Sequence, residues 1–442
     1  MNYPKVLIIG QPFNRVSGGG ITLTNLFKLW PKDKLYLATN THRALKNDFS
    51  ICPNVYLLGK DEVKIPFFLH FFLRNKPSGV ISNPQEGRNT TQSINPSVIK
   101  KTSFLYNPLS FIVGLLNLKF LFYRISISNQ FILWLKEVKP DIIYSQLGHY
   151  EFNLFVFKLK KEYNLPLVIH IMDDWPQKCT TGIASKYWQK KMSESFINVL
   201  SVTDELITIS ESMMEEYKLR YGMGTHYFHN PVKLPNVTVK PYMQKPNNLK
   251  IGYFGRIGLS NLSSIKRTIE VVDRLICDGY NFSFDIYTPD NHVLGSVGSS
   301  TLINVLNSIP HQDIFSYLMK YDILLLPLDF DSTSIEFVKF SFPTKASEYM
   351  ASGRLIVIFG PKQSAVVRHA IKHKWSVVVD NNDTNYFANK LLSIYNNIDD
   401  FYEYRKNAYK IAIKEFNEDV VCAKFLELFV DLNLRKPCFC FS

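Results

Sequence analysis

The chain has 442 residues, a formal net charge of +13, and a composition that is 46% hydrophobic and 14% aromatic. This length exceeds one average domain, so we expect two sizeable hydrophobic cores. Charged residues make up only 20% of the chain and form no long Lys/Arg block, which excludes a solvated basic tail and makes nucleic acid a poor candidate partner. The positive charge instead favours phosphorylated small molecules or an anionic membrane surface.

The cysteines and the N-terminal segment both favour the cytoplasm. Six cysteines are scattered along the sequence without a CxxC pair, which is typical of a reducing compartment rather than of a disulfide framework. The apolar run Val6–Ile9 is too short for the hydrophobic region of a signal peptide. A zinc site at Cys438 and Cys440 is disfavoured because no second Cys or His pair lies nearby.

The first predicted element is a buried parallel strand over residues 5–10, a continuous apolar run that ends in glycine. Gly18, Gly19 and Gly20 then precede a helical pattern over 21–27, and glycines before a helix let a ligand approach the backbone closely. The spacing is not that of the GxGxxG fingerprint, so a nicotinamide enzyme is disfavoured. A flexible loop is the alternative.

An aromatic insertion at about 60–128 interrupts the first half of the chain. Residues 65–72 and 104–123 are apolar and aromatic, and Lys100, Lys101 and Arg124 border them. This composition predicts a surface that binds anionic membranes, with core helices as an equally good alternative. Polar residues and a proline interrupt the longer stretch, so we reject a transmembrane helix.

Alternating strand and helix patterns predict an α/β fold with two doubly wound parallel sheets. We expect an N-terminal domain over 1–229, a linker rich in Pro, Asn and Lys over 230–248, a second domain over 249–400, and C-terminal helices over 401–442 that pack back towards the first domain. Further strands are expected at 35–38, 55–58, 141–145, 167–171 and 205–209, and then at 250–255, 282–287, 323–327, 355–359 and 376–379.

The segment SFPTKASEYMASG at 341–353 is the most informative motif. Pro343 suits the first turn of a helix, and Ser341 or Thr344 would satisfy free N–H groups there. Lys345 adds a cation beside the positive end of the helix dipole, so a diphosphate would bind well at this place.

Glu348 lies about one turn into the same helix, where it can accept a hydrogen bond from a sugar hydroxyl of a bound nucleotide. The helical pattern stops at Gly353. An ordinary capped helix with a surface lysine is the alternative interpretation of this segment.

Four segments in order resemble the GT-B glycosyltransferases, specifically the retaining family-4 type. They are LITISES at 206–212 with NPV at 230–232, IGYFGR at 251–256, and PTKASEYMASG at 343–353. The resemblance implies two Rossmann-like domains that face each other across a cleft, with the nucleotide sugar held mostly by the C-terminal domain.

The resemblance implies donor-side roles for several residues. Arg256 follows the first strand of the second domain and would bind the diphosphate, to which its planar fork is suited. Asn261 stands where the family usually has a lysine, and Lys345 is our preferred substitute. Glu348 matches the glutamate that contacts the nucleotide ribose, but Phe340 stands where a first, sugar-contacting glutamate is expected.

On the acceptor side, the segment that follows the strand at 167–171 carries Asp173 where many relatives have a His-Asp pair, and Met172 replaces the histidine. Asp173 would orient an acceptor hydroxyl, with Asp174 or His170 as substitutes. His149, at another strand end, is a weaker candidate. A helix-capping role is the alternative for either aspartate.

The pair Asp329 and Asp331 only superficially suggests a DxD manganese site, because no histidine accompanies it. We therefore expect no metal and no cofactor, and a retaining enzyme that transfers a sugar from a nucleoside-diphosphate sugar, UDP or GDP, to a glycan or lipid-linked acceptor in bacterial surface polysaccharide synthesis. A nucleotide-sugar epimerase of the same fold and a catalytically degenerate, membrane-associated partner are the rivals. We expect a cytoplasmic location, with peripheral binding to the inner membrane if the aromatic insertion forms a membrane surface.

Overall fold

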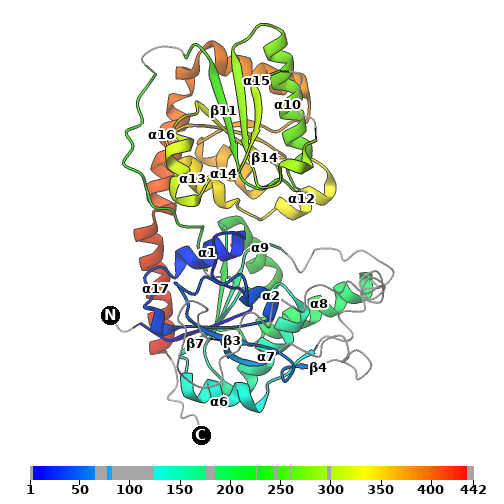
Figure 1. Cartoon of the computed structure of the whole chain (residues 1–442), viewed down its shortest axis with the longest axis vertical. Coiled ribbons are helices and arrows are strands. Elements are labelled where there is room, and N and C mark those ends of the chain that lie inside the picture. Colours follow the sequence, from blue (N-terminus) through cyan, green and yellow to red (C-terminus); the bar gives the residue numbers. More distant parts are fainter. Residues whose placement is uncertain are drawn as a thin grey trace. The chain divides into compact units, whose positions relative to one another are not determined.

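The computed structural model divides the chain into two compact units (Figure 1). The first unit consists of Met1–Phe228 together with Cys422–Ser442, and the second of His229–Val421. The stretch expected as a linker, 230–248, therefore groups with the second unit. The structure describes residues 3–64, 77–81, 124–174, 185–224, 226–242, 246–258, 260–295 and 300–435, so the aromatic stretches at 65–72 and 104–123 lie outside the described residues.

The first unit is built on an eight-stranded sheet in the order β10-β9-β8-β7-β1-β2-β3-β5, parallel except that β5 runs antiparallel to β3. All six strands expected in this half are confirmed to within a residue or two. The strands are β1 (Val6–Ile9), β2 (Leu35–Thr39), β3 (Asn54–Leu57), β5 (Gly79–Ile81), β7 (Ile142–Ser145), β8 (Leu167–Ile171), β9 (Glu205–Thr208) and β10 (His226–Tyr227), with β4 (Val63–Lys64) and β6 (Arg124–Ile125) paired separately.

Helices cover this sheet through aromatic contacts. Phe131 of α6 packs on Phe155 of α7 with ring centroids 5.4 Å apart. Phe27, just after α1, packs edge-on against Phe425 and Phe429 of α17, which brings the C-terminal segment into the first unit. The helices are α1 (Gly18–Leu26), α2 (Thr41–Ala44), α6 (Asn129–Val138), α7 (Tyr150–Tyr163), α8 (Ser185–Leu200), α9 (Glu211–Tyr221) and α17 (Glu418–Leu434).

The second unit has a wholly parallel six-stranded sheet in the order β13-β12-β11-β14-β15-β16. The five expected strands are confirmed, and one, β13, was missed. The strands are β11 (Leu249–Phe254), β12 (Phe282–Tyr287), β13 (Ile303–Leu306), β14 (Ile323–Pro327), β15 (Leu355–Phe359) and β16 (Val377–Val379).

Both faces of this second sheet are covered, which explains its continuous apolar strands. Leu325 of β14 belongs to the core beneath α10 and α15, whereas Leu324 belongs to the core beneath α13, α14 and α16 (Figure 1). The helices are α10 (Leu262–Cys277), α11 (Ile314–Leu318), α12 (Ser332–Val338), α13 (Thr344–Ala351), α14 (Ala365–His373), α15 (Thr384–Asn396) and α16 (Tyr402–Ile411). None of the helices in the described part of the chain has the length and apolarity needed to span a bilayer.

Candidate active site

In each unit the strand order reverses beside the first strand, and ligands of doubly wound sheets bind beyond the carboxyl ends of the strands at such a point. In the second unit this point lies between β11 and β14, and in the first between β1 and β7. We therefore expect the site residues at these two edges.

A glycine turn follows β11 in the second unit. Gly255 has φ +137°, a conformation that favours glycine, and a Cβ there would lie 2.8 Å from the Lys345 Nζ. Arg256 comes next in the chain. The turn thus brings the two cations expected to bind a diphosphate to the same edge of one sheet.

Arg256 forms a two-point ion pair with Asp290, which follows β12. Its Nε lies 3.2 Å from Oδ2 and its Nη2 lies 3.0 Å from Oδ1, while the Ile257 N–H also donates to the carboxylate. Hydrogen bonding from Arg256 lowers the pKa of Asp290. The Arg256 side chain is still 70% exposed, so its guanidinium is oriented by Asp290 and retains a solvent face for an anion.

Lys345, at the start of α13, donates from Nζ to the Tyr253 hydroxyl at 2.8 Å and lies over the same ring, 4.1 Å from its centroid. The hydroxyl in turn donates to the Arg256 carbonyl, and Asn261 Nδ2 donates to both oxygens. Tyr253 therefore links the Lys345 ammonium to the backbone of Arg256. Burial lowers the pKa of Lys345 to about 7, although the residue as a whole is only partly buried.

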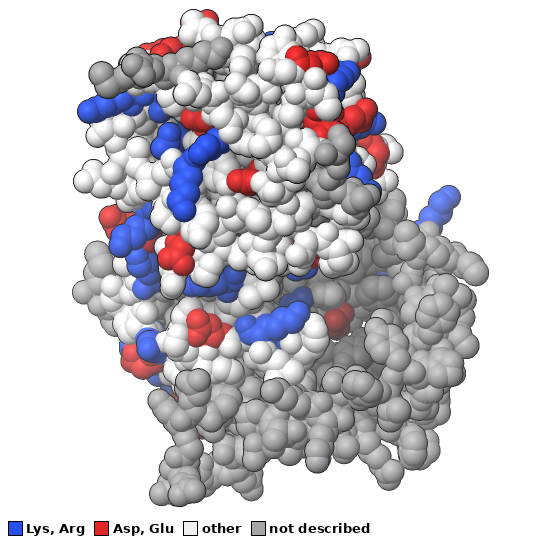
Figure 2. All heavy atoms as spheres, turned by 45° about the horizontal axis from the view of Figure 1, so that its top comes forward, with Lys and Arg blue, Asp and Glu red and all other residues white. Residues whose placement is uncertain are grey.

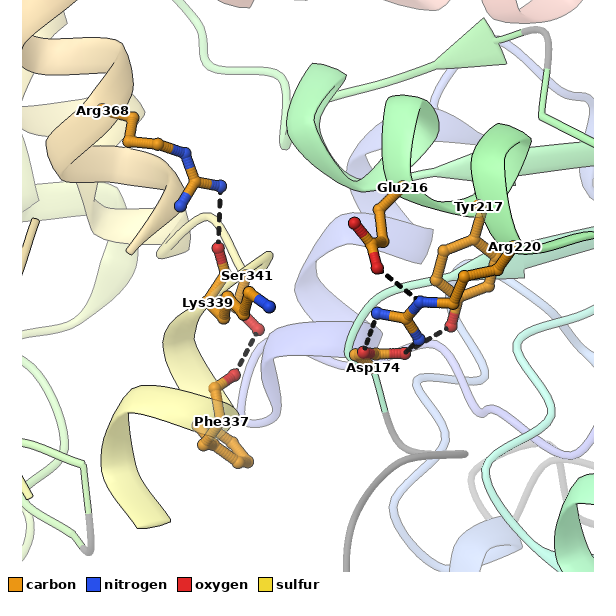
Figure 3. A network of polar contacts seen from close by, with 8 residues as sticks. All are labelled: Asp174, Glu216, Tyr217, Arg220, Phe337, Lys339, Ser341 and Arg368. Carbon is orange, nitrogen blue, oxygen red and sulfur yellow. Dashed lines mark hydrogen bonds and ion pairs between the residues drawn. The ribbon is translucent and has the colours of Figure 1, made fainter. Parts of the chain in front are cut away.

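The expected side-chain cap of α13 is wrong. Pro343 itself occupies the N-cap position, and it makes no side-chain hydrogen bond to the first turn. The Ser341 hydroxyl points back and donates to the Phe337 carbonyl of α12, while Arg368 of α14 donates to the Lys339 carbonyl (Figure 3). Thr344 is the first helical residue. Pro343 has no side-chain acceptor and cannot itself satisfy the first N–H groups of α13.

Glu348 has a protein partner that the sequence did not reveal. One of its carboxylate oxygens lies 3.0 Å from His311 Nε2, an ion-pair distance without hydrogen-bond alignment. Phe340, where an acid was expected, is buried. The helix does end as expected, with Gly353 at φ +68°.

The aspartates that resemble a DxD motif cap two helices. Asp329, which is buried, accepts from the Ser263 and Ser264 N–H groups at the start of α10. Asp331 accepts from the Ser334 N–H as the N-cap of α12. Within the described residues, no group of three or more His, Cys, Asp or Glu could hold a metal ion.

The three glycines of the first unit form the first turn of α1 rather than a loop before it, which corrects the expected element boundary. A Cβ on Gly19 would lie 2.6 Å from Gln146 Oε1, and a Cβ on Gly20 would lie 2.4 Å from Asn14 Oδ1. A Cβ on Gly18 would meet nothing within 4 Å. The last two glycines therefore serve local packing, and Gly18 is the one that borders open space.

The Asp174 carboxylate takes part in a network of hydrogen bonds and ion pairs (Figure 3). Arg220 donates to both of its carboxylate oxygens, at 3.1 and 2.9 Å, and the Tyr217 hydroxyl donates to one of them at 3.0 Å. Glu216 holds Arg220 from the other side at 2.6 Å. Asp174 is therefore a poor substitute for an acceptor-orienting acid.

His170 is also structural, since it is fully buried in β8 with its Nδ1 2.8 Å from the Tyr144 hydroxyl. Burial lowers its pKa to about 3, which keeps the ring neutral. Asp173 follows the same strand and is only partly buried. Among the three expected acceptor-side residues of this segment, Asp173 is the one that borders solvent.

His149 occupies the N-cap position of α7, after a turn in which Gly148 has φ +92°. Burial lowers its pKa, and the neighbouring Arg43 lowers it further, while Glu151 opposes this shift. Arg43 was missed by sequence reasoning. Arg43 lies four residues beyond the end of β2, at the edge that also carries His149. This position in the predicted sheet could have identified it as a site residue.

The described charges do not reveal a membrane surface. On the face that Figure 2 shows, Lys and Arg side chains are interspersed with Asp and Glu. Lys100 and Lys101 lie outside the described residues, so the membrane surface stays a prediction.

Comparison with known proteins finds a sequence similarity for the second unit and a similarity of fold for the whole chain. Residues 248–397 match the family model described as Glycosyl transferases group 1. No curated protein matches the sequence.

Three solved structures illustrate the similarity. HepE from Anabaena, in complex with UDP and glucose, has a TM-score of 0.59 at 12% identity, over 97% of this chain and 100% of that one. Sucrose-phosphate synthase from Thermosynechococcus elongatus has 0.55 at 13% identity, over 98% and 99%. A glycosyltransferase from Rickettsia africae has 0.57 at 12% identity, over 99% and 100%. The chain therefore has the GT-B fold of two parallel-sheet α/β domains, and its second unit is similar to glycosyltransferase group 1 domains.

Proposed function

We propose that this protein is a retaining glycosyltransferase that moves a sugar from a nucleoside-diphosphate sugar to a glycan or lipid-linked acceptor. The observation that carries the proposal is the coincidence of the glycosyltransferase match, residues 248–397, with the sheet edge that carries both Arg256 and Lys345. The HepE complexes with UDP and UDP-glucose support UDP as the first nucleotide to test, with GDP as the second.

In the proposed reaction the acceptor hydroxyl attacks the sugar on the face from which the diphosphate departs. The leaving phosphate oxygen accepts the hydroxyl proton, so no protein nucleophile is required. Arg256 presents its exposed guanidinium to the diphosphate, and Lys345 with the N-terminus of α13 stabilises the charge that develops there. Glu348 accepts from the nucleotide ribose.

The first unit would serve the acceptor. Asp173 would orient the attacking hydroxyl, and His149 would lie beside the acceptor at the end of β7. Of Gly18, Gly19 and Gly20, Gly18 leaves open space for the acceptor or the phosphates at the start of α1.

We propose that no metal is needed, because Asp329 and Asp331 are already bonded to helix N-termini. The setting would be bacterial surface polysaccharide synthesis in the cytoplasm. Peripheral binding to the inner membrane through residues 65–72 and 104–123 would bring the enzyme to a lipid-linked acceptor.

A hydrolysis screen of UDP-, GDP- and ADP-sugars tests the proposal. The wild type should release nucleoside diphosphate from at least one donor, and Arg256→Ala should lower kcat/KM by about 10²- to 10³-fold, as loss of one transition-state donor does. Arg274→Ala is the matched control, because Arg274 is an exposed arginine of α10 that bonds Asn385. If the wild type neither turns over nor binds any of these nucleotides, the enzyme assignment is wrong.

A degenerate binding partner is the second candidate, and buried Phe340 at the position of the expected acid favours it. Such a protein would bind a nucleotide without turnover, even with acceptor present. A nucleotide-sugar epimerase would instead release a free epimerised product, which chromatography of the reaction separates from a transferred sugar.

A further inference from the structure

Arg43 is a partly buried arginine at the carboxyl edge of the first sheet, next to β1. It lies on α2, just beyond the carboxyl end of β2, with its guanidinium carbon 5.1 Å from the centroid of the Phe152 ring. Gly10, which follows β1 with φ +92°, lies close to both, since a Cβ there would approach Nη1 to 3.2 Å and the Phe152 ring to 3.5 Å. The guanidinium is therefore fixed in place by the fold.

This guanidinium has no hydrogen-bond or ion-pair partner among the described residues. Its Nη1 has no exposed surface and no acceptor, and burial lowers the pKa of the side chain. The nearest acid that influences it, Glu151, lies beyond ion-pair distance and is 3.9 Å from His149 Nδ1 instead. A buried donor nitrogen without an acceptor is costly, and such groups are normally paired or bound to a ligand.

A second titratable group faces the same place. His149 follows β7, and the charge of Arg43 lowers its pKa. The two groups come from different strand ends on opposite sides of β1, where ligands of doubly wound sheets bind. An oxyanion between them would supply the acceptor that Arg43 lacks and would favour protonated His149.

We infer that Arg43 and His149 form a binding site for an oxyanion, and that the anion is a phosphate or carboxylate group of the acceptor. The assignment to the acceptor rests on the proposed function, in which Arg256 and Lys345 of the second unit take the donor diphosphate. The site adds a requirement that the proposed function does not contain, since a wholly neutral sugar acceptor would leave Arg43 unpaired.

Calorimetric titration of the full chain with inorganic phosphate, after saturation with UDP to fill the donor site, tests the inference. The wild type should bind phosphate, and Arg43→Met should weaken this binding by about 10- to 100-fold, because hydrogen bonds to a charged group are lost. Lys46→Met, which removes an exposed charge from the same segment, should leave it unchanged. Equal binding by wild type and Arg43→Met would overturn the site, and loss of wild-type binding on saturation with UDP would overturn the acceptor assignment.

Thermal unfolding separates a binding arginine from a structural one, even if Arg43→Met alters the fold. Without ligand, Arg43→Met should melt at or above the wild-type temperature, since an unpaired enclosed charge is removed, and added phosphate should raise the Tm of the wild type only. A large fall in Tm for Arg43→Met, without any phosphate effect on the wild type, would show a structural arginine and contradict the inference.

His149 gives an independent readout. Sulfate, whose charge is constant near neutral pH, should bind the wild type more tightly as pH falls through the His149 pKa, and histidine-labelled NMR should show that pKa rising when sulfate is present. His149→Gln should abolish this pH dependence. The thermal unfolding and sulfate measurements use neither nucleotide nor turnover, so failure of the glycosyltransferase assignment and failure of the oxyanion site are distinguishable.

Discussion

The two switch points of this molecule carry similar cations in opposite situations. In the second unit, Arg256 pairs with Asp290 and Lys345 bonds Tyr253, so both cations are oriented in the absence of any ligand. In the first unit, Arg43 is just as firmly placed, yet no described residue bonds its guanidinium.

This difference in bonding predicts different roles for the two sheet edges in ligand binding. Asp290 orients Arg256 and leaves one face of the guanidinium exposed. Such a preorganised cation can stabilise the negative charge that develops in a transition state. A cation enclosed without a partner depends on the ligand itself for its hydrogen bonds. We therefore expect substitutions of Arg256 and Lys345 to act on turnover and substitutions around Asp174 to act on stability.

The largest effect is expected from Asp174→Ala. It removes the acceptor of two Arg220 hydrogen bonds and one from Tyr217, and breaking such a buried pair costs about 3–5 kcal/mol. Urea unfolding followed by tryptophan fluorescence measures this loss in the first unit. Glu215→Ala, an exposed acid on the same helix, should cost less than about 0.5 kcal/mol. A stable Asp174→Ala variant that loses transfer alone would instead make Asp174 the acceptor-orienting acid.

Lys345→Met is expected to lower donor turnover by about 10²- to 10³-fold, because a charge that faces the leaving group is lost. The wild type should also show a pH effect. With the Lys345 pKa at about 7 in the free protein, the ammonium form that binds a diphosphate is present below pH 7 and is lost as pH rises through it. Donor affinity should therefore fall above pH 7.

The control for this slope is Lys339→Met, an exposed lysine six residues upstream whose loss should leave the pH profile unchanged. Lys345→Met should flatten the profile of donor affinity. If the slope persists in that variant, another group is responsible for it, and Lys345 is a structural partner of Tyr253.

Glu348→Gln should weaken donor binding by about 10- to 100-fold, which corresponds to the loss of about 1.5–3 kcal/mol for a hydrogen bond to a charged group. Titration with UDP measures it. His311→Asn removes the ion-pair partner but keeps the carboxylate, so its donor affinity should stay near the wild-type value. If both variants lose the same stability and both keep the wild-type donor affinity, the only role of Glu348 is its ion pair with His311.

The sequence predicted the strands that have a clear local apolar pattern. It did not predict side-chain pairs between residues that are far apart in the chain. The run Ile323–Pro327 was readable as a strand because both of its faces are buried, whereas edge strand β13 exposes Asn304 and breaks the apolar pattern. The positions of Arg256 and Lys345 at one edge followed from the resemblance. Their partners did not, because Asp290 lies 34 residues from Arg256 and meets it only through the strand order.

The smallest effect is expected at Asp329, whose carboxylate caps the N-terminus of α10 in the second unit. Asp329→Ala removes the acceptor for two N–H groups of α10 and should cost about 1–2 kcal/mol, as loss of a helix cap does. Asp329→Asn keeps a side-chain oxygen of similar capping strength and should recover most of this stability.

The same pair of variants separates a cap from a metal ligand. A capping Asp329 predicts that donor turnover follows stability, so Asp329→Asn stays close to the wild type and EDTA has no effect on either protein. A metal-binding carboxylate predicts the reverse, because an amide is a weaker ligand for a hard cation than a carboxylate. Loss of turnover in a stable Asp329→Asn variant, restored by added Mn²⁺, would therefore mean that the carboxylate leaves α10 to bind a metal, and that this edge is less preorganised than its hydrogen bonds indicate.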